Sequence, residues 1–128
     1  MILKCIQCGS EFPTHSPKDK CEKCRGTLEY KIDLSKSRKI KFSGQLHFWR
    51  YRPLLPPIQH VTSLGEGGTP LHRAERLAEN FGLKELYLKD ETRNPTNSYR
   101  DRAAALLTSN AIDLQFDTLI CASNGNLG

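Results

Sequence analysis

Cysteines are the residues of this sequence with the clearest chemistry, and four of the five form two CxxC pairs. The pairs are Cys5 with Cys8 and Cys21 with Cys24, separated by residues 9–20. Two CxxC pairs at this separation are typical of a tetrahedral zinc site in which two short loops each supply two thiolates. Iron in a rubredoxin-like site uses the same ligands, and the spacing fits both ions. The sequence therefore predicts a metal-binding ribbon, with zinc as the expected ion.

The residues around these pairs are expected to support the metal rather than react. Four thiolates complete a tetrahedral shell, so His15 is predicted to be a loop residue and the metal to be structural. About 30 residues cannot bury a sufficient core without such a staple. Gly9 and Gly26 follow the two pairs, where a tight loop favours a positive φ. Cys121 lies in the apolar run 119–122, where we expect a small buried side chain.

The positive charge of the chain is concentrated in its first part. The 128 residues carry a net charge of +5. Residues 1–52 hold 12 basic and 5 acidic side chains, which gives +7, and the remainder holds 7 and 9, which gives −2. Together with the aromatic residues Phe48, Trp49 and Tyr51, this charge fits a zinc-ribbon binding module for nucleic acid or a protein partner. A divalent ion on four thiolates would lower the +7 to +5, which weakens that hypothesis.

No segment of the sequence predicts membrane insertion or export. The longest strictly apolar run, 103–107, is far shorter than the about 20 residues that span a bilayer. Only Ile2 and Leu3 separate Met1 from Lys4, which leaves no apolar core for a signal peptide. We therefore expect a cytoplasmic chain without a membrane partner.

The pattern of apolar residues divides the chain into three parts. We predict a zinc ribbon at 1–45, a linker at 46–60 and the first portion of an α/β domain at 61–128. In the last part a helix, a strand, a helix and a strand follow one another, which indicates a parallel sheet with a site at the strand ends. The expected elements are a strand at 28–34, a glycine-rich turn at 65–70, a helix at 74–81 ended by Gly82, a strand at 86–88, a helix opened by a capping box of Ser98 and Asp101, and a buried strand at 118–121.

The segments that connect these elements are rich in charge and proline. The basic run 36–41 is expected to be a solvated link. The aromatic and basic residues at 47–52 are followed by three prolines within 53–57, which favours a segment pinned onto the next domain over a surface that stacks on bases. The chain ends at Gly128, where the next helix should begin, so we expect an incomplete sheet with one face uncovered. An unpaired edge makes self-association a further expectation.

Several motifs occur in a specific order along the whole chain. They are the CxxC pairs and the segments 49–52, 64–71, 88–91, 94–102 and 122–126. In this order they resemble the N-terminal part of the zinc-ribbon-bearing threonine synthases, which belong to the fold-type II pyridoxal-phosphate enzymes and are much longer. The resemblance implies a threonine-synthase-like fragment, truncated or degenerate. The family reaction is a lyase step of amino-acid biosynthesis that converts O-phosphohomoserine and water to threonine and phosphate.

The resemblance also implies which residues meet the cofactor and the amino-acid substrate. In the family pattern NPTGSFKDR the lysine forms the Schiff base with pyridoxal phosphate, and this chain has Arg100 in that place. A guanidinium stays protonated and cannot attack an aldehyde, so the chain is predicted to be inactive alone. By the same correspondence Asn126 would lie beside the pyridine ring oxygen of the cofactor. The substrate would meet Ser98, Ser123 and Asn124.

Other positions also depart from the family pattern. Asn97 replaces a glycine, which is tolerable because asparagine adopts positive φ. Asn124 stands where the family has threonine or serine, and Leu127 removes a hydroxyl that would meet the substrate carboxylate. The glycine-rich turn and the Asn-Pro-Thr segment have no use in a binding ribbon. The resemblance to an enzyme family is therefore favoured over the binding module, and we do not expect nucleic acid as a partner.

Overall fold

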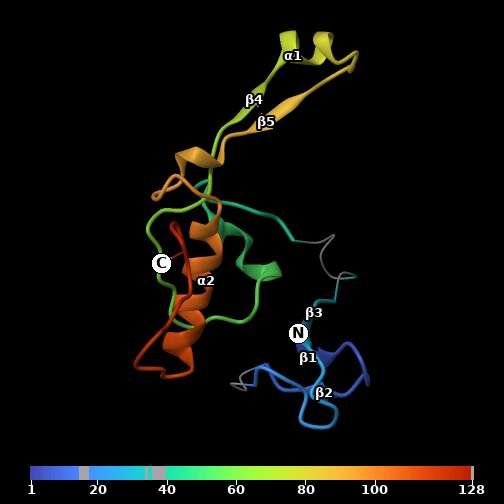
Figure 1. Ribbon diagram of the computed structural model, residues 1–128, viewed down its shortest axis with the longest axis vertical. Helices are drawn as coiled ribbons and strands as arrows, with labels where there is room; N and C mark the ends of the chain where they lie inside the picture. Colours follow the sequence, from blue (N-terminus) through green and yellow to red (C-terminus); the bar gives the residue numbers. More distant parts are fainter. Residues whose placement is uncertain (15–17, 34, 36–39, 128) are drawn as a thin grey trace.

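The structure is a computed structural model that describes residues 1–14, 18–33, 35 and 40–127. Figure 1 shows a small sheet near the N-terminus, a helical part around α2, and a narrow two-stranded arm that carries α1. The predictions for His15, for Leu34 and for most of the basic run 36–41 lie outside the described residues.

The N-terminal sheet is built from β1 (Ile2–Cys5), β2 (Glu11–Phe12) and β3 (Leu28–Lys31). Its order is β2-β1-β3, and both ladders are antiparallel. In β3 the side chains alternate between half-buried and exposed, as the period-two pattern predicts for a sheet with one wet face. The central strand β1 ends at Cys5, which pairs with Leu28, so the sheet places the first cysteine beside the start of β3.

The segment 46–60 packs onto helix α2 (Arg100–Asp113). It contains the 3₁₀ helix η2 (Phe48–Leu54), whose Trp49 forms a buried core with Ile58 and Ala105. Partly buried apolar side chains of Phe48, Leu55 and Leu106 cover this core. The expectation that the aromatic residues pin this segment onto the following part is therefore confirmed. The boundaries proposed for the three parts of the chain stay predictions.

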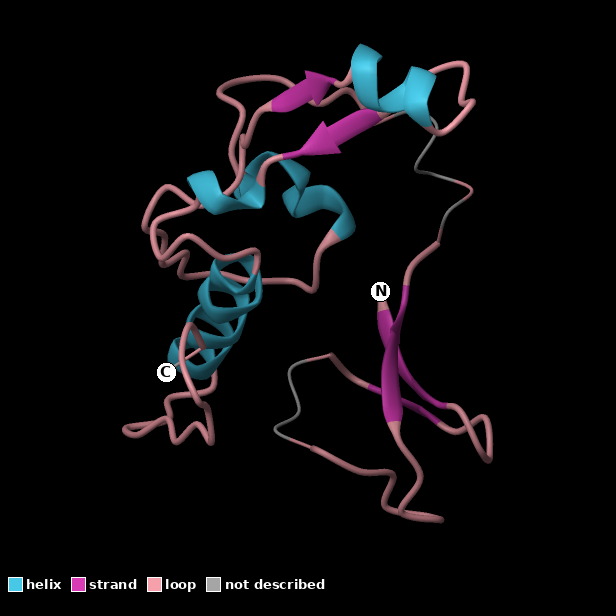
Figure 2. Ribbon diagram, turned by 45° about the horizontal axis from the view of Figure 1, so that its top comes forward, coloured by secondary structure: helices cyan, strands magenta, loops and turns pink. Residues whose placement is uncertain are grey.

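The two-stranded arm differs from the predicted parallel sheet. Strands β4 (Leu71–Arg73) and β5 (Tyr87–Lys89) pair antiparallel, with α1 (Glu75–Asn80) between them, and Figure 2 shows the helix at the far end of the arm. A parallel pair needs a crossover connection that carries the chain back to the end of the sheet where the first strand begins. Helix α1 spans only about 9 Å along its axis, and the chain turns straight back after it. The predicted helix, and its end at Gly82 with a φ of 64°, are confirmed.

Helix α2 confirms the predicted helix but begins differently from the expected capping box. The carboxylate of Asp101 accepts the backbone N–H of Thr96 at 2.8 Å, whereas the box requires that of Ser98. The hydroxyl of Ser98 accepts the N–H of Arg100 at 3.3 Å. The chain turns at 94–97, with Asn97 at a φ of 59°, and this turn brings Thr96 to the carboxylate. Among the described residues, no helix is long and apolar enough to cross a membrane.

The buried strand expected at 118–121 is absent from the structure. Ile120 is 94% exposed, and Leu119 and Cys121 are exposed as well, so the expected burial of Cys121 is wrong. A strand needs a neighbour for its backbone hydrogen bonds, and residues 118–121 pair with none of the described strands. The chain instead returns toward the beginning of α2, where the Asn126 side-chain amide donates to the Thr96 carbonyl at 2.7 Å.

Candidate functional site

The four cysteines of the CxxC pairs form one cluster. All four Sγ atoms lie within 4.8 Å of one another, and the Sγ–Sγ distances are 3.5 Å for Cys5 and Cys24 and 3.6 Å for Cys8 and Cys21. With Zn–S bonds of 2.3 Å, the edge of a tetrahedron of thiolates is about 3.8 Å. The four sulfur atoms and their spacing therefore fit tetrahedral coordination of an ion of the size of zinc.

Two similar loops position the thiolates. The N–H of Gly9 donates to the Cys5 carbonyl at 3.0 Å, and the N–H of Arg25 donates to the Cys21 carbonyl at 2.8 Å. Gly9 has the predicted positive φ, 72°, but in the second loop Arg25 takes that conformation with a φ of 58°. Gly26 is needed for space, because a Cβ there would lie 3.0 Å from the Cys5 sulfur. The prediction of a positive φ at Gly26 is therefore wrong.

The thiols of this cluster differ in acidity. Hydrogen bonds with the side chain and backbone of Ser10 lower the pKa of Cys8 to about 6. Cys24 has a backbone interaction with Gly26 that favours its thiolate, but its contacts with Cys8 and Cys5 raise its pKa to about 12. Because a metal binds thiolates, its uptake here must release protons.

A second group of predicted residues lines a cavity at the beginning of α2. This cavity has a volume of about 370 Å³, and its lining includes Arg100, Ser123 and Asn124, together with Ala122 and Leu127. Ser98 lies next to it through its hydrogen bond with the Arg100 N–H. The hydroxyl of Ser123 is engaged in its own turn, where it accepts the N–H of Gly125 at 3.1 Å. The structure thus brings together three residues that the sequence singles out.

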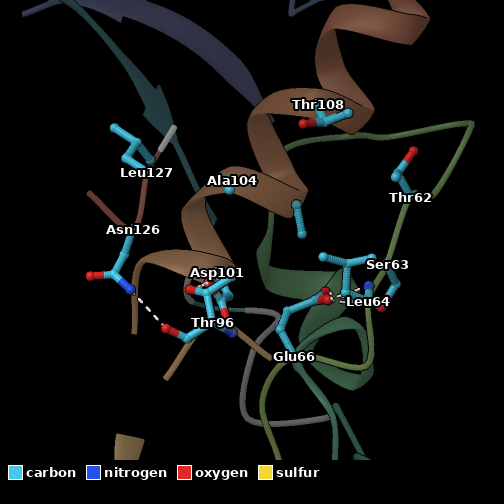
Figure 3. A pocket seen from close by; sticks show the side chains of 11 residues that line it. Thr62, Ser63, Leu64, Glu66, Thr96, Asp101, Ala104, Thr108, Asn126 and Leu127 are labelled. Atoms are coloured by element: carbon cyan, nitrogen blue, oxygen red, sulfur yellow. Dashed lines mark hydrogen bonds between the residues drawn. The ribbon is translucent and has the colours of Figure 1, made fainter. Parts of the chain in front are cut away.

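Asn126 lies in a neighbouring cavity of about 310 Å³, shown in Figure 3. Its amide points toward Thr96, and Leu127 lines both this cavity and the one that contains Arg100. On the other side of the cavity the Glu66 carboxylate, only 1% exposed, accepts the Leu64 N–H at 2.9 Å and hydrogen bonds from Ser63. Asn126 and Arg100 therefore occupy adjacent cavities rather than one.

Glu91 forms hydrogen bonds with Thr69, Asn94 and Arg102, and we call these four residues the Glu91 clamp. The sequence alone did not predict this group, which connects the elements around the two cavities. The Glu91 carboxylate accepts two hydrogen bonds from Arg102, at 2.8 and 2.9 Å, and one each from Thr69 at 2.6 Å and Asn94 at 2.9 Å. The hydrogen bonds from Arg102 lower the pKa of Glu91 to about 2, with help from Thr69 and Asn94. All four residues lie in the ordered motifs, but their spacing along the chain gives no sign that they meet.

The glycine-rich turn packs against the segment that precedes η2. A Cβ at Gly67 would lie 2.5 Å from the Phe48 nitrogen, and a Cβ at Gly68 would lie 1.6 Å from the Leu46 carbonyl oxygen. The Phe48 N–H donates to the Glu66 carbonyl at 2.8 Å. Both glycines are thus required for the close approach of two backbone segments.

Comparisons with known proteins identify the family of this chain. The family described as "Pyridoxal-phosphate dependent enzyme" matches residues 62–128. Threonine synthase of Methanosarcina acetivorans is 40% identical over 128 residues, which cover 97% of this chain and 31% of that protein. Threonine synthase of Methanocaldococcus jannaschii is 36% identical over 133 residues, with 98% of this chain and 33% of that protein covered. A third threonine synthase, from Halalkalibacterium halodurans, is 40% identical over 78 residues, 59% of this chain and 22% of its own.

The chain thus spans about a third of the length of the first two relatives. It has no significant match among solved structures. The family match covers more than half of the chain and includes the cavity with Arg100, the neighbouring Asn126 and the Glu91 clamp. This chain therefore belongs to the pyridoxal-phosphate dependent enzymes, and within them it is threonine-synthase-like.

Proposed function

We propose that this chain forms the N-terminal region of a threonine-synthase-like enzyme in which Arg100 prevents covalent attachment of pyridoxal phosphate. The observation that carries the proposal is the position of Arg100. It is the first residue of α2 and lines a cavity with Ser123 and Asn124, and the family pattern has a lysine in its place. The reaction proposed for the whole enzyme is the conversion of O-phosphohomoserine to threonine.

The residues of this cavity do not fit a covalently held pyridoxal phosphate. A guanidinium has no unprotonated amine at physiological pH, so it cannot form a Schiff base with an aldehyde. The described residues that line the cavity include no lysine. The ammonium of Lys89, the lysine of the motif 88–91, donates a hydrogen bond to the Thr69 carbonyl instead. The chain on its own is therefore proposed to be inactive, with Asn126, Ser98, Ser123 and Asn124 as candidate contacts of a non-covalent ligand.

Borohydride reduction in the presence of pyridoxal phosphate tests this proposal. The wild-type chain should give no stoichiometric adduct by mass spectrometry, and Arg100→Lys should give one that maps to residue 100. Arg76→Lys is the matched control, because Arg76 is exposed on α1 and lines neither cavity. A stoichiometric adduct on the wild-type protein would overturn the proposal.

The cysteine cluster is proposed to hold a structural zinc ion. The support is the donor set, four thiolates at tetrahedral spacing, which leaves no open position for a substrate. The family match covers 62–128, and threonine synthases match 97% and 98% of this chain, so an enzyme is better supported than a nucleic-acid or protein-binding module. A cytoplasmic location and self-association through the unpaired edge of an incomplete sheet stay predictions.

A further inference from the structure

A small cavity with basic walls lies between η2, the glycine-rich turn and α2. Its volume is about 130 Å³, and the residues that line it include His47, Arg50, Lys89 and Arg102. It shares no lining residue with the cavity that contains Arg100 or with the one that contains Asn126. We propose that this cavity binds a small tetrahedral oxyanion, with free inorganic phosphate as its ligand.

The charge of the lining favours an anion. Arg50, Lys89 and Arg102 contribute three positive charges, and the described lining residues include no carboxylate. The nearest acid in the hydrogen-bond network is Glu91, and both of its oxygens are already engaged by Arg102, Thr69 and Asn94. Glu91 thus balances one of the three cations, and the buried Glu66 carboxylate also attracts Arg102. At least one positive charge of the lining stays without an acidic partner, and an anion would balance it.

Two side chains of the lining, Arg50 and His47, carry hydrogen-bond donors. The Nε of Arg50 is buried without a hydrogen-bond partner, although its Nη2 donates to the Phe42 carbonyl at 3.0 Å. Because this Nε is out of contact with solvent, an anion in the cavity would interact with the charge of the Arg50 guanidinium rather than with this atom. The Nδ1 of His47 accepts the Trp49 N–H at 3.1 Å, so the proton of the neutral ring lies on Nε2. His47 lines the cavity, so its ring can supply an uncharged N–H donor there.

The size of the cavity selects among anions. A water molecule takes about 30 Å³ in the liquid, and pockets for larger organic ligands run from about 300 Å³ upward. At about 130 Å³ the cavity holds an ion of a few atoms but not a nucleotide or a cofactor. Phosphate carries between one and two negative charges at neutral pH, which suits the positive charge that remains in the lining. The close packing of Gly68 against Leu46 keeps one wall in place, because no side chain fits between them.

Calorimetric titration of the metal-loaded full chain with inorganic phosphate tests this proposal. We expect a Kd of about 1 mM or tighter, weakened by sodium chloride because the interaction is between charges. Arg50→Gln and Lys89→Gln should each raise the Kd by about tenfold, which corresponds to one lost charged contact. Lys89 is exposed, so its replacement should leave the fold intact if the Arg50 variant unfolds. Arg76→Gln, on the exposed side of α1, is the control and should leave the Kd unchanged.

Titration with O-phosphoserine tests whether the cavity prefers free phosphate. O-Phosphoserine should bind more weakly than phosphate, because its amino-acid part does not fit the cavity; tighter binding would overturn the choice of free phosphate. No heat of binding at a phosphate concentration of about 10 mM would overturn the proposal, since binding would then be weaker than any useful affinity. An unchanged Kd in a folded Lys89→Gln variant would overturn the assignment to this cavity.

Discussion

Replacing Glu91 by glutamine tests whether the clamp holds the glycine-rich turn and α2 together. The carboxylate of Glu91 accepts hydrogen bonds from Thr69, Asn94 and Arg102, which come from three separate segments. Glutamine keeps the size of the side chain but removes the negative charge. It leaves the Arg102 guanidinium, 24% exposed, without its ion-pair partner. We therefore expect a loss of stability rather than a change of shape.

The magnitude follows from the pKa of Glu91. The clamp lowers this pKa from 4.5 to about 2. At 1.36 kcal/mol per pH unit, the shift corresponds to about 3 kcal/mol at neutral pH. Because the side chain is 25% exposed, solvent screens part of this, and we expect about 2 kcal/mol. The folded-state pKa is depressed, so this stabilisation is present above pH 4.5 and is lost as the pH falls toward 2.

Urea unfolding followed by tryptophan fluorescence measures this effect. Trp49 is the single tryptophan and lies in the core against α2, so it reports on the part that the clamp stabilises. The difference between wild type and Glu91→Gln should be about 2 kcal/mol at pH 7, with less than half of it left near pH 3. Glu79→Gln, at an exposed position of α1, is the control and should change little. A difference below about 0.5 kcal/mol at pH 7, or one that does not vary with pH, would refute the reasoning.

Three further changes can be measured in the same chain. Gly68→Ala should destabilise the chain by about 2 kcal/mol or more in the same urea assay, because the new Cβ would lie 1.6 Å from the Leu46 carbonyl oxygen. Gly125→Ala is the control and should be neutral, because a Cβ at residue 125 meets nothing within 4 Å. Ser109→Ala should cost about 1–2 kcal/mol, because the fully buried hydroxyl accepts the Thr62 N–H at 2.9 Å and donates to the Ala105 carbonyl at 2.7 Å; an unchanged midpoint would contradict this. Removing the metal with a chelator should abolish the circular-dichroism signal of the β1–β3 sheet while Trp49 fluorescence stays constant. The reason is that no hydrogen bond between described residues joins 1–31 to 42–127. Simultaneous loss of both signals would argue against separate folding of the two parts.

Local patterns predict this fold well, and distant pairings are where the sequence misleads. The spacing of Cys5 and Cys8 brings two thiolates together within a single turn, and Gly82 ends α1 within its own neighbourhood, so both features follow from adjacent residues. The apolar run at 118–121 has the composition of a buried strand but no neighbouring strand among the described residues. The composition of a segment indicates that it could form a strand but not which strand it pairs with. For this reason the sequence predicts a strand at 118–121 that the structure lacks, and a parallel sheet where β4 and β5 pair antiparallel.

The same contrast applies to the site. Arg100, Ser123 and Asn124 are placed together as the ordered motifs imply, because segments 94–102 and 122–126 meet at the beginning of α2. The Glu91 clamp was missed because its members lie on separate elements, and only the fold reveals that they converge. Arg102 lies in the first turn of α2, where the helix dipole disfavours a cation, and its ion pair with Glu91 offsets that cost.

The hydrogen bonds that hold the beginning of α2 do not depend on the side chain of Arg100. The beginning of α2 is held by Thr96 with Asp101, by Asn126 with Thr96, and by the Glu91 clamp. None of these hydrogen bonds uses the Arg100 side chain, whose described neighbours are the Tyr99 ring and the residues of its cavity. The frame that positions residue 100 is thus independent of which cation stands there. A lysine at this position would therefore meet an unchanged cavity, so a failure of Arg100→Lys to form an adduct would count against Arg100 as the reason that the wild-type chain forms none.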